Sequence, residues 1–244
     1  MSHIRKLLIL GLLFFNACGR PPHTTPAATP VLINVALTPA MGTFREVLHS
    51  CSKAHTEFIL NVYESSAGTL DQQSVDLVIQ LGGDPDPKFT YPIGEETIDL
   101  IVNSSNNVMT ISEEKLRDIF SGRITSWAEV GGEQQPVHVW IYPDVYATRR
   151  IFDGVFTLNE NLSPNALIAP NPQAMLEAIG DDPLAIGYVP QSWLAQDQNG
   201  EQVRPLQINQ KLVELLHQPV YALSQIKPGD ALQKLLICLQ STKH

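Results

Sequence analysis

The sequence predicts an α/β fold. Short segments rich in Val, Ile and aromatic residues alternate along the chain with segments whose apolar residues recur at helical spacing. This alternation is typical of a sheet flanked by helices. Beyond an N-terminal leader-like segment, roughly 210 residues remain, which is enough for one large domain or for two lobes.

Each expected element follows from its local pattern. Strands are expected where β-branched residues lie between turn residues, and helices where apolar residues share one helical face. The expected strands are 32–37, 58–63, 75–80, 97–103, 137–141, 185–189, 203–208 and 220–224. The expected helices are 40–54, one that begins near 109, 147–156, 172–179 and 228–240.

The segment from Met109 to Gly132 is the most distinctive stretch of the chain. Thr110 and Glu113 have the spacing of a capping box, and the residues that follow form one apolar helical face. Gly122 lies where a left-handed residue ends a helix. These features describe a structural module and do not by themselves indicate a function.

The amino-acid sequence of this segment resembles that of the phosphate-type periplasmic solute-binding proteins of ABC transporters. The shared pattern is L-x-x-I-F-x-G-x-I-x-x-W-x-x-x-G-G, followed downstream by A-I-G-Y at 185–188. Weaker similarity extends from about Val31 to the C-terminus. The residues that carry the pattern are Leu116, Ile119, Phe120, Gly122, Ile124, Trp127, Gly131 and Gly132.

The resemblance implies a type 2 periplasmic-binding-protein-like fold with two lobes, each a mixed sheet flanked by helices. We expect residues 31–103 in the first lobe, 104–205 in the second, and 206–244 in a return to the first. In this family the ligand lies between the lobes, near helix N-termini, where free N–H groups and the helix dipole favour an anion.

Two loops of the first lobe are expected to face the ligand. Thr38 and Pro39 precede the first helix, where the Thr38 hydroxyl either contacts an anion or caps the helix. After the second strand, Ser65, Ser66 and Gly68 belong to a small-residue loop that allows close approach to a compact ion.

A third loop enters the helix that begins at 147. Family members often carry an arginine and then Ser-Gly-Thr here, whereas this chain has Tyr142 at the arginine position and only Thr148 of the triplet. Tyr146, Thr148 and Arg149 are candidate ligand contacts. For Arg149 the alternative is a solvated helix charge beside Arg150.

These departures leave the ligand open. The segment 80–84 lacks the Ser-Asp pair of phosphate binders, whose acidic residue would accept a hydrogen bond from the proton of hydrogen phosphate. Tyr142 and Tyr146 suit a pocket for a larger, partly apolar organic anion, or they fill the cleft. The interpretations are therefore binding of phosphate or another small oxyanion, binding of an organic anion, or a degenerate scaffold used in signalling or envelope interactions.

The N-terminus predicts export. Arg5 and Lys6 precede a short apolar run, and Cys18 follows Ala17, so residues 1–17 have the pattern of a lipoprotein signal peptide; a plain secretory signal is the alternative. Residues 18–30 are rich in proline and lack large apolar residues, which predicts a disordered tether. We expect a chain lipid-anchored at the outer face of the cell membrane or in the periplasm.

Two cysteines remain beyond the anchor. An even pair in an exported chain suggests one disulfide, and the resemblance places the first and last helices, which carry Cys51 and Cys238, on the same lobe. Two buried free thiols are the alternative.

Composition excludes other classes. The chain has 16 basic and 25 acidic residues, and without Arg5 and Lys6 its net charge is −11, which argues against nucleic-acid binding. We expect no enzyme, because no G-x-S-x-G elbow is present. We expect no metal or cofactor, because the favoured interpretation of His49, Cys51 and His55 is an ordinary polar helix face. The expected protein is a monomeric solute-binding lipoprotein whose partners are a small anion and an ABC transporter permease.

Overall fold

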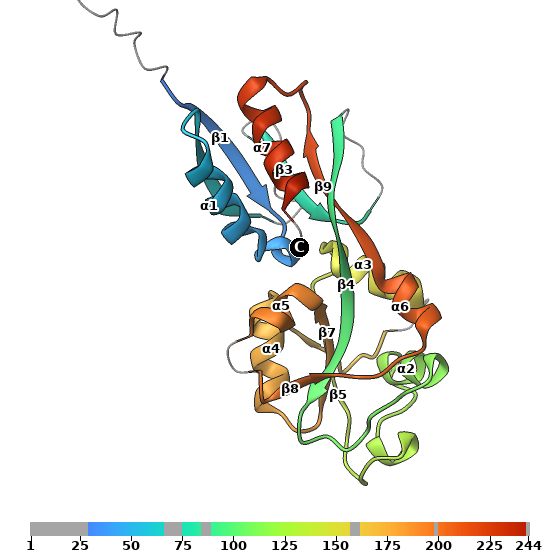
Figure 1. The fold of residues 1–244 in the computed structure, drawn as a ribbon. Coiled ribbons are helices and arrows are strands. Elements are labelled where there is room, and N and C mark those ends of the chain that lie inside the picture. Colours follow the sequence, from blue (N-terminus) through green and yellow to red (C-terminus); the bar gives the residue numbers. More distant parts are fainter. Residues whose placement is uncertain (1–28, 66–74, 84–88, 157–161, 198–199, 243–244) are drawn as a thin grey trace, which may run out of the picture.

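The computed structural model describes residues 29–65, 75–83, 89–156, 162–197 and 200–242. Within these ranges the chain forms two lobes, each built from strands and flanking helices (Figure 1). The α/β prediction and the two-lobed arrangement are confirmed. The strands are β1 (Val31–Leu37), β2 (Phe58–Glu64), β3 (Leu77–Leu81), β4 (Phe89–Asn103), β5 (His138–Ile141), β6 (Leu167–Ile168), β7 (Ala185–Pro190), β8 (Val203–Pro205) and β9 (His217–Ser224).

The helices cover both lobes. The α-helices are α1 (Phe44–Ala54), α2 (Glu113–Phe120), α3 (Ala147–Phe156), α4 (Pro172–Asp181), α5 (Gln191–Gln196), α6 (Gln210–Leu216) and α7 (Asp230–Ser241), and the short 3₁₀ helices are η1 (Pro39–Met41) and η2 (Trp127–Val130). Helices α1 and α7 pack together on the first lobe, and Cys51 and Cys238 are joined there by a disulfide with their Cα atoms 6.0 Å apart. The structure therefore contains the disulfide and not the two buried free thiols.

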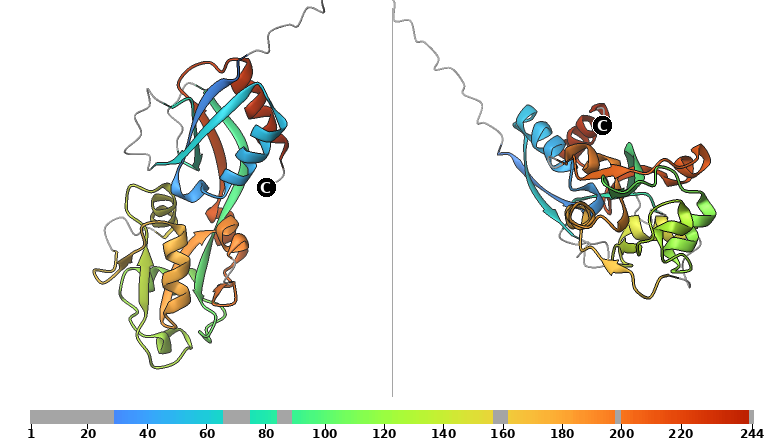
Figure 2. Two further views of the ribbon diagram at one scale, coloured as in Figure 1. Left: turned by 90° about the vertical axis from the view of Figure 1, so that its left-hand side faces the viewer. Right: turned by 90° about the horizontal axis from the view of Figure 1, so that it is seen from below.

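The sheet order is β2-β1-β3-β9-β4-β7-β5-β6, with β8 paired to β4. Strands β1, β2 and β3 are parallel to one another, and β5 is parallel to β7. Strand β4 belongs to both lobes, as Figure 2 shows in its left-hand view. Its first part, Phe89–Thr97, pairs with β9, and from Ile98 onward it pairs with β7 and then also with β8. The lobe boundaries by residue number stay a prediction.

This pairing makes the carboxyl ends of the parallel strands of the two lobes face each other. The last residue of β7, Pro190, pairs with Ile98, next to Thr97 where β4 leaves β9. On the other side, the end of β3 pairs with Val220 of β9, which is also opposite Gly94 of β4. Loops that follow β1, β3, β5 and β7 therefore meet at the lobe junction.

Several elements differ from the sequence-based expectation. The helix expected at 40–54 is divided into η1 and α1, because Gly42 and Thr43 form a turn between them. The N-cap of α2 is Ser112, whose hydroxyl accepts from the Lys115 backbone N–H, so the capping box proposed for Thr110 and Glu113 is wrong. Strand β4 begins eight residues earlier than expected, because its first half exposes one polar face and lacks a continuous apolar run.

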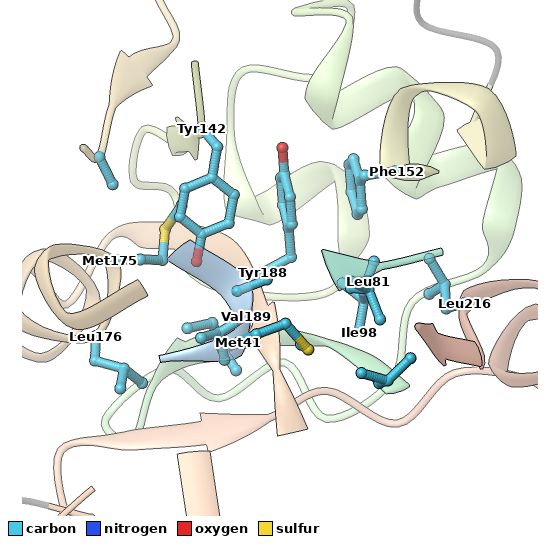
Figure 3. Close-up of a cluster of buried hydrophobic side chains, with 14 of the residues drawn as sticks. Met41, Leu81, Ile98, Tyr142, Phe152, Met175, Leu176, Tyr188, Val189 and Leu216 are labelled. Atoms are coloured by element: carbon cyan, nitrogen blue, oxygen red, sulfur yellow. The ribbon is translucent and has the colours of Figure 1, made fainter. Parts of the chain in front are cut away.

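The second lobe is organised around aromatic side chains. Phe152 stacks on Tyr188 with ring centroids 3.8 Å apart, and Phe120 lies edge-on to Phe152 at 4.7 Å. Figure 3 shows Tyr188 and Phe152 side by side, with Tyr142 on the other side of Tyr188. The apolar face predicted for α2 is buried against this group, because Leu116, Ile119 and Phe120 have no exposed surface.

Gly122 and Gly131 have φ of 77° and 92°, as expected for residues that end a helix or turn in the left-handed region. No helix in the described ranges has both the length and the apolar character needed to cross a bilayer. Among the same residues, no group of three or more His, Cys, Asp or Glu side chains is arranged to hold a metal ion.

Candidate site between the lobes

The turn after β1 is the first component of the candidate site. Thr38 is at the N-cap position of η1, but its hydroxyl makes no capping bond. Instead, both the Thr38 backbone N–H and its hydroxyl donate to the Ile79 carbonyl, at 3.0 and 3.3 Å. The residue is 4% exposed. The capping alternative is therefore wrong for the side chain, and the hydroxyl oxygen keeps its capacity to accept.

The loop after β2 begins beside this turn. The Ser65 backbone N–H donates to the Leu37 carbonyl at 2.9 Å, which holds the start of the loop against the end of β1. Ser66 and Gly68 lie outside the described residues, so their proposed contacts stay a prediction. Glu64, the last residue of β2, contacts the Arg45 guanidinium at 3.4 Å.

The loop between β5 and α3 is the component from the second lobe. The Tyr146 hydroxyl donates to the Pro170 carbonyl at 2.8 Å. Burial and, to a lesser extent, the Glu64 carboxylate of the first lobe raise the pKa of Tyr146. Thr148 is 3% exposed, on the first turn of α3.

Arg149 is held inside the second lobe. Its Nε donates to the Asp153 carboxylate at 2.6 Å, and its Nη1 donates to the Tyr142 carbonyl at 2.7 Å. The residue is 9% exposed, so the alternative of a solvated helix charge is wrong. Burial raises the pKa of Asp153, and the Arg149 guanidinium acts in the opposite direction. The ligand contact proposed for Arg149 stays a prediction, although two of its donors are already used.

Tyr142 follows the last residue of β5, on the edge of the second lobe that faces the first. It is 1% exposed, and its hydroxyl has no hydrogen-bond partner among the described residues. Figure 3 shows this hydroxyl directed toward the side where Met41 of η1 lies. Burial raises the pKa of Tyr142 well above the usual value, so the phenol stays protonated.

Two contacts between the lobes involve α5. The Trp193 indole N–H donates to the Ala40 carbonyl at 2.9 Å, and the hydroxyls of Thr43 and Ser192 are 3.1 Å apart. A Cβ atom at Gly42 would come within 2.5 Å of the Trp193 ring. The lobes are thus in contact through η1 and the turn that follows it.

A pair of carboxylates lies on β4 at the same junction. Glu96 is 8% exposed and accepts from the backbone N–H groups of Thr97 and Ser192, at 2.9 and 3.4 Å. Burial and the nearby Glu96 charge raise the pKa of Asp99 to about 6. A hydrogen bond with Gln191 acts in the opposite direction. Sequence reasoning did not single out either residue. The sequence offered one signal for this site, because Asp99 is an acidic residue within the apolar run Ile98–Val102.

The geometry defines a class of protein: two α/β lobes that share strand β4, with strand ends and helix starts meeting between them. The family model described as PBP superfamily domain matches residues 82–233, and the chain belongs to this superfamily. Its type 2 binding-protein fold supports a role in binding a solute.

A curated relative and several solved structures resemble the chain. The phosphate-binding protein PstS of Bacillus subtilis is 32% identical over 96 residues, which span 39% of this chain and about a third (32%) of that protein. A putative phosphate ABC transporter substrate-binding protein from Clostridium perfringens, solved with phosphate, has a TM-score of 0.74 at 17% identity over 85% of this chain and 92% of its own.

Two further structures share the fold. A phosphate transport receptor from Vibrio cholerae has a TM-score of 0.65 at 19% identity, with 86% of this chain and 93% of its own covered. A full-length OxyR variant of Pseudomonas aeruginosa also has a TM-score of 0.65, at 10% identity, with 86% of this chain and 69% of its own covered. At these identities the likeness concerns the fold alone.

Proposed function

We propose that the protein is the extracytoplasmic solute receptor of an ABC importer and binds a small oxyanion, such as phosphate, between its lobes. The observation that carries this proposal is the convergence of the loops after β1, β2 and β5 at a junction crossed by strand β4. Such an arrangement lets two rigid lobes close on a solute, with the bending confined to the connections between the lobes, strand β4 among them.

The relatives support the choice of ligand class. The similar proteins from B. subtilis, C. perfringens and V. cholerae are all named for phosphate binding or transport. In this chain the ligand contacts would come from Thr38, Ser65 and Thr148, with helix N-termini supplying backbone N–H donors. Closure would create the surface that a transporter permease recognises.

We further propose that Cys18 carries a lipid anchor and that residues 18–30 tether the folded part to the membrane. This rests on the N-terminal sequence pattern alone, because residues 1–28 lie outside the described part of the chain. Metabolic labelling with a fatty acid, compared between the native chain and Cys18→Ala, tests the anchor. Loss of label in the variant is expected.

A second candidate is a scaffold whose cleft its own side chains fill. Its support is that Tyr142 is fully buried and that Trp193 contacts Ala40 directly across the junction. Such a protein would recognise another macromolecule through its surface, in signalling or in envelope interactions.

Thermal unfolding of residues 29–244 against a panel of solutes separates these candidates. The panel contains phosphate, sulfate, molybdate, phosphonates and small organic acids. A ligand at a hundred times its dissociation constant adds roughly 2.7 kcal/mol, which raises the Tm by a few degrees. A shift with phosphate or another oxyanion is the expected result, a shift with organic acids alone would move the ligand to that class, and no shift would favour the scaffold.

A further inference from the structure

We propose that the phenolic hydroxyl of Tyr142 donates a hydrogen bond to an oxygen of the bound solute and so helps determine which solute is accepted. This inference rests on the proposed solute-receptor function. It concerns a residue whose chemistry differs from that of the arginine expected at this position.

The position of Tyr142 in the fold is the first argument. Because β5 runs parallel to β7, and β7 ends at Pro190 beside the lobe junction, the residue after β5 lies on the edge that faces the first lobe. Tyr142 belongs to the same buried cluster as Met41 of η1, and Figure 3 shows its hydroxyl pointing to that side. The side chain therefore reaches toward the turn that also carries Thr38.

The missing partner is the second argument. A buried hydroxyl without a hydrogen-bond partner costs about 1–3 kcal/mol, so native proteins nearly always provide one. Its aromatic neighbours do not supply it. The Tyr146 hydroxyl is bonded to the Pro170 carbonyl, and the rings of Tyr142 and Tyr146 are 6.2 Å apart. A solute oxygen that arrives between the lobes would supply the acceptor that the described residues lack.

The groups around Tyr142 keep its hydroxyl protonated and therefore able to donate a hydrogen bond. Burial raises the pKa of Tyr142, and Tyr188 and Tyr146 act in the same direction, so the phenol keeps its proton and can donate. The nearby Arg149 uses Nε for Asp153 and Nη1 for the Tyr142 carbonyl. Tyr142 thus offers a neutral donor, held in place by Arg149 through its own backbone.

The hydroxyl has no access to solvent in this conformation, in which the lobes already touch. The solute must therefore reach Tyr142 while the lobes are apart, and closure would then bury the new hydrogen bond. Exclusion of water from such a bond makes its loss costly, because the acceptor oxygen is left unpaired.

Tyr142→Phe tests the inference, with Tyr188→Phe as the matched control. Tyr188 is also fully buried, and its hydroxyl has no hydrogen-bond partner among the described residues, but this hydroxyl points the opposite way in Figure 3. Burial raises the pKa of Tyr188, and Arg149, Asp153 and the Tyr142 backbone influence it from within the second lobe. Each variant removes one oxygen and keeps the ring. Calorimetric titration with inorganic phosphate and, separately, with acetate and lactate measures affinity, and thermal unfolding without solute measures stability.

We expect Tyr142→Phe to keep or raise stability without solute and to weaken binding of the solute that the native protein takes by at least about tenfold. Tyr188→Phe should keep native affinity. The solute that responds, phosphate or a carboxylate, identifies the source of the oxygen.

Equal affinities in Tyr142→Phe and the native protein would overturn the inference and leave the receptor function intact. An equal loss in both variants would also overturn it, because the effect would then come from packing of the second lobe. No binding of any probe by the native protein would overturn the proposed function and the inference together.

Discussion

The indole N–H of Trp193 in the second lobe donates to the carbonyl of Ala40 in the first, 2.9 Å away and 153 residues earlier in the chain. This bond joins the start of α5 to η1, next to the loops proposed to hold the solute. Gly42 follows in the same turn, and the Trp193 ring occupies the space where a Cβ atom would stand. Closure of the lobes thus depends on a glycine and a tryptophan that face each other.

Gly42→Ala should force the lobes apart. The added methyl group would lie 2.5 Å from Cζ2 of Trp193, a distance that the ring can relieve only by moving away. Small-angle scattering of residues 29–244 without solute should show a larger radius of gyration. Gly154→Ala, where a Cβ atom meets nothing within 4 Å, is the control. An unchanged radius in Gly42→Ala would mean that Trp193 does not hold the lobes together.

Arg149→Ala should destabilise the second lobe by about 3–5 kcal/mol, because it leaves the Asp153 carboxylate buried without its counter-charge. The side chains of this pair are only 11% and 12% exposed. The double variant Arg149→Met/Asp153→Leu should recover most of the loss, since no charge then remains unpaired. Urea unfolding of both variants measures the difference, and near-native stability of Arg149→Ala would contradict the structural role of the pair.

Asp99 should make the protein less stable as pH rises through the range from about 4 to about 6. Its pKa is raised in the folded state from 3.8 to about 6, so in this window the folded state binds more protons than the unfolded state. Stability is therefore lost as the folded group ionises. Asp99→Asn should flatten this part of the Tm–pH profile and raise the Tm at pH 7.

The control for Asp99 is Glu114→Gln, an exposed position on the first turn of α2. It should leave the slope between pH 4 and pH 6 as in the native protein. If Asp99→Asn has the same slope as the native protein, the pH dependence arises from other groups.

Replacing both Cys51 and Cys238 by Ser should lower the free energy of unfolding by about 2–5 kcal/mol. The disulfide closes a loop with a sequence separation of 187 residues and joins α1 to α7 on the first lobe. Urea unfolding with and without reductant checks the value. Solute affinity should be unchanged, because the bond lies away from the lobe junction. An unfolding midpoint that does not respond to reductant would contradict this expectation.

The elements with strong local signals were predictable. The apolar face of α2, the left-handed Gly122 and the buried strand at 185–190 all follow from periodicity and turn chemistry, which act over a few residues. The first half of β4 and helices α5 and α6 were missed. They are short or polar on one face, and their stability comes from packing against distant segments.

The candidate site was predictable only in outline. Pattern placed Thr38 and Ser65 on loops that follow strands and Thr148 at the start of a helix, and the structure has these strand ends at one junction. The i, i+4 spacing of Arg149 and Asp153 allows an ion pair, but local pattern could not show that both side chains are buried, because burial depends on the segments packed against α3.

The sequence by itself determined the α/β class, the superfamily and the presence of a cysteine pair, since these depend on local periodicity and on residue types in order. Tertiary structure alone decided which polar groups are buried. It buried the Arg149–Asp153 pair, whose i, i+4 spacing is local, it buried the Asp99 carboxyl near the Glu96 charge, and it left the Tyr142 hydroxyl without a partner among the described residues. The physical reason is that desolvation and hydrogen bonding depend on which distant residues share the same interior.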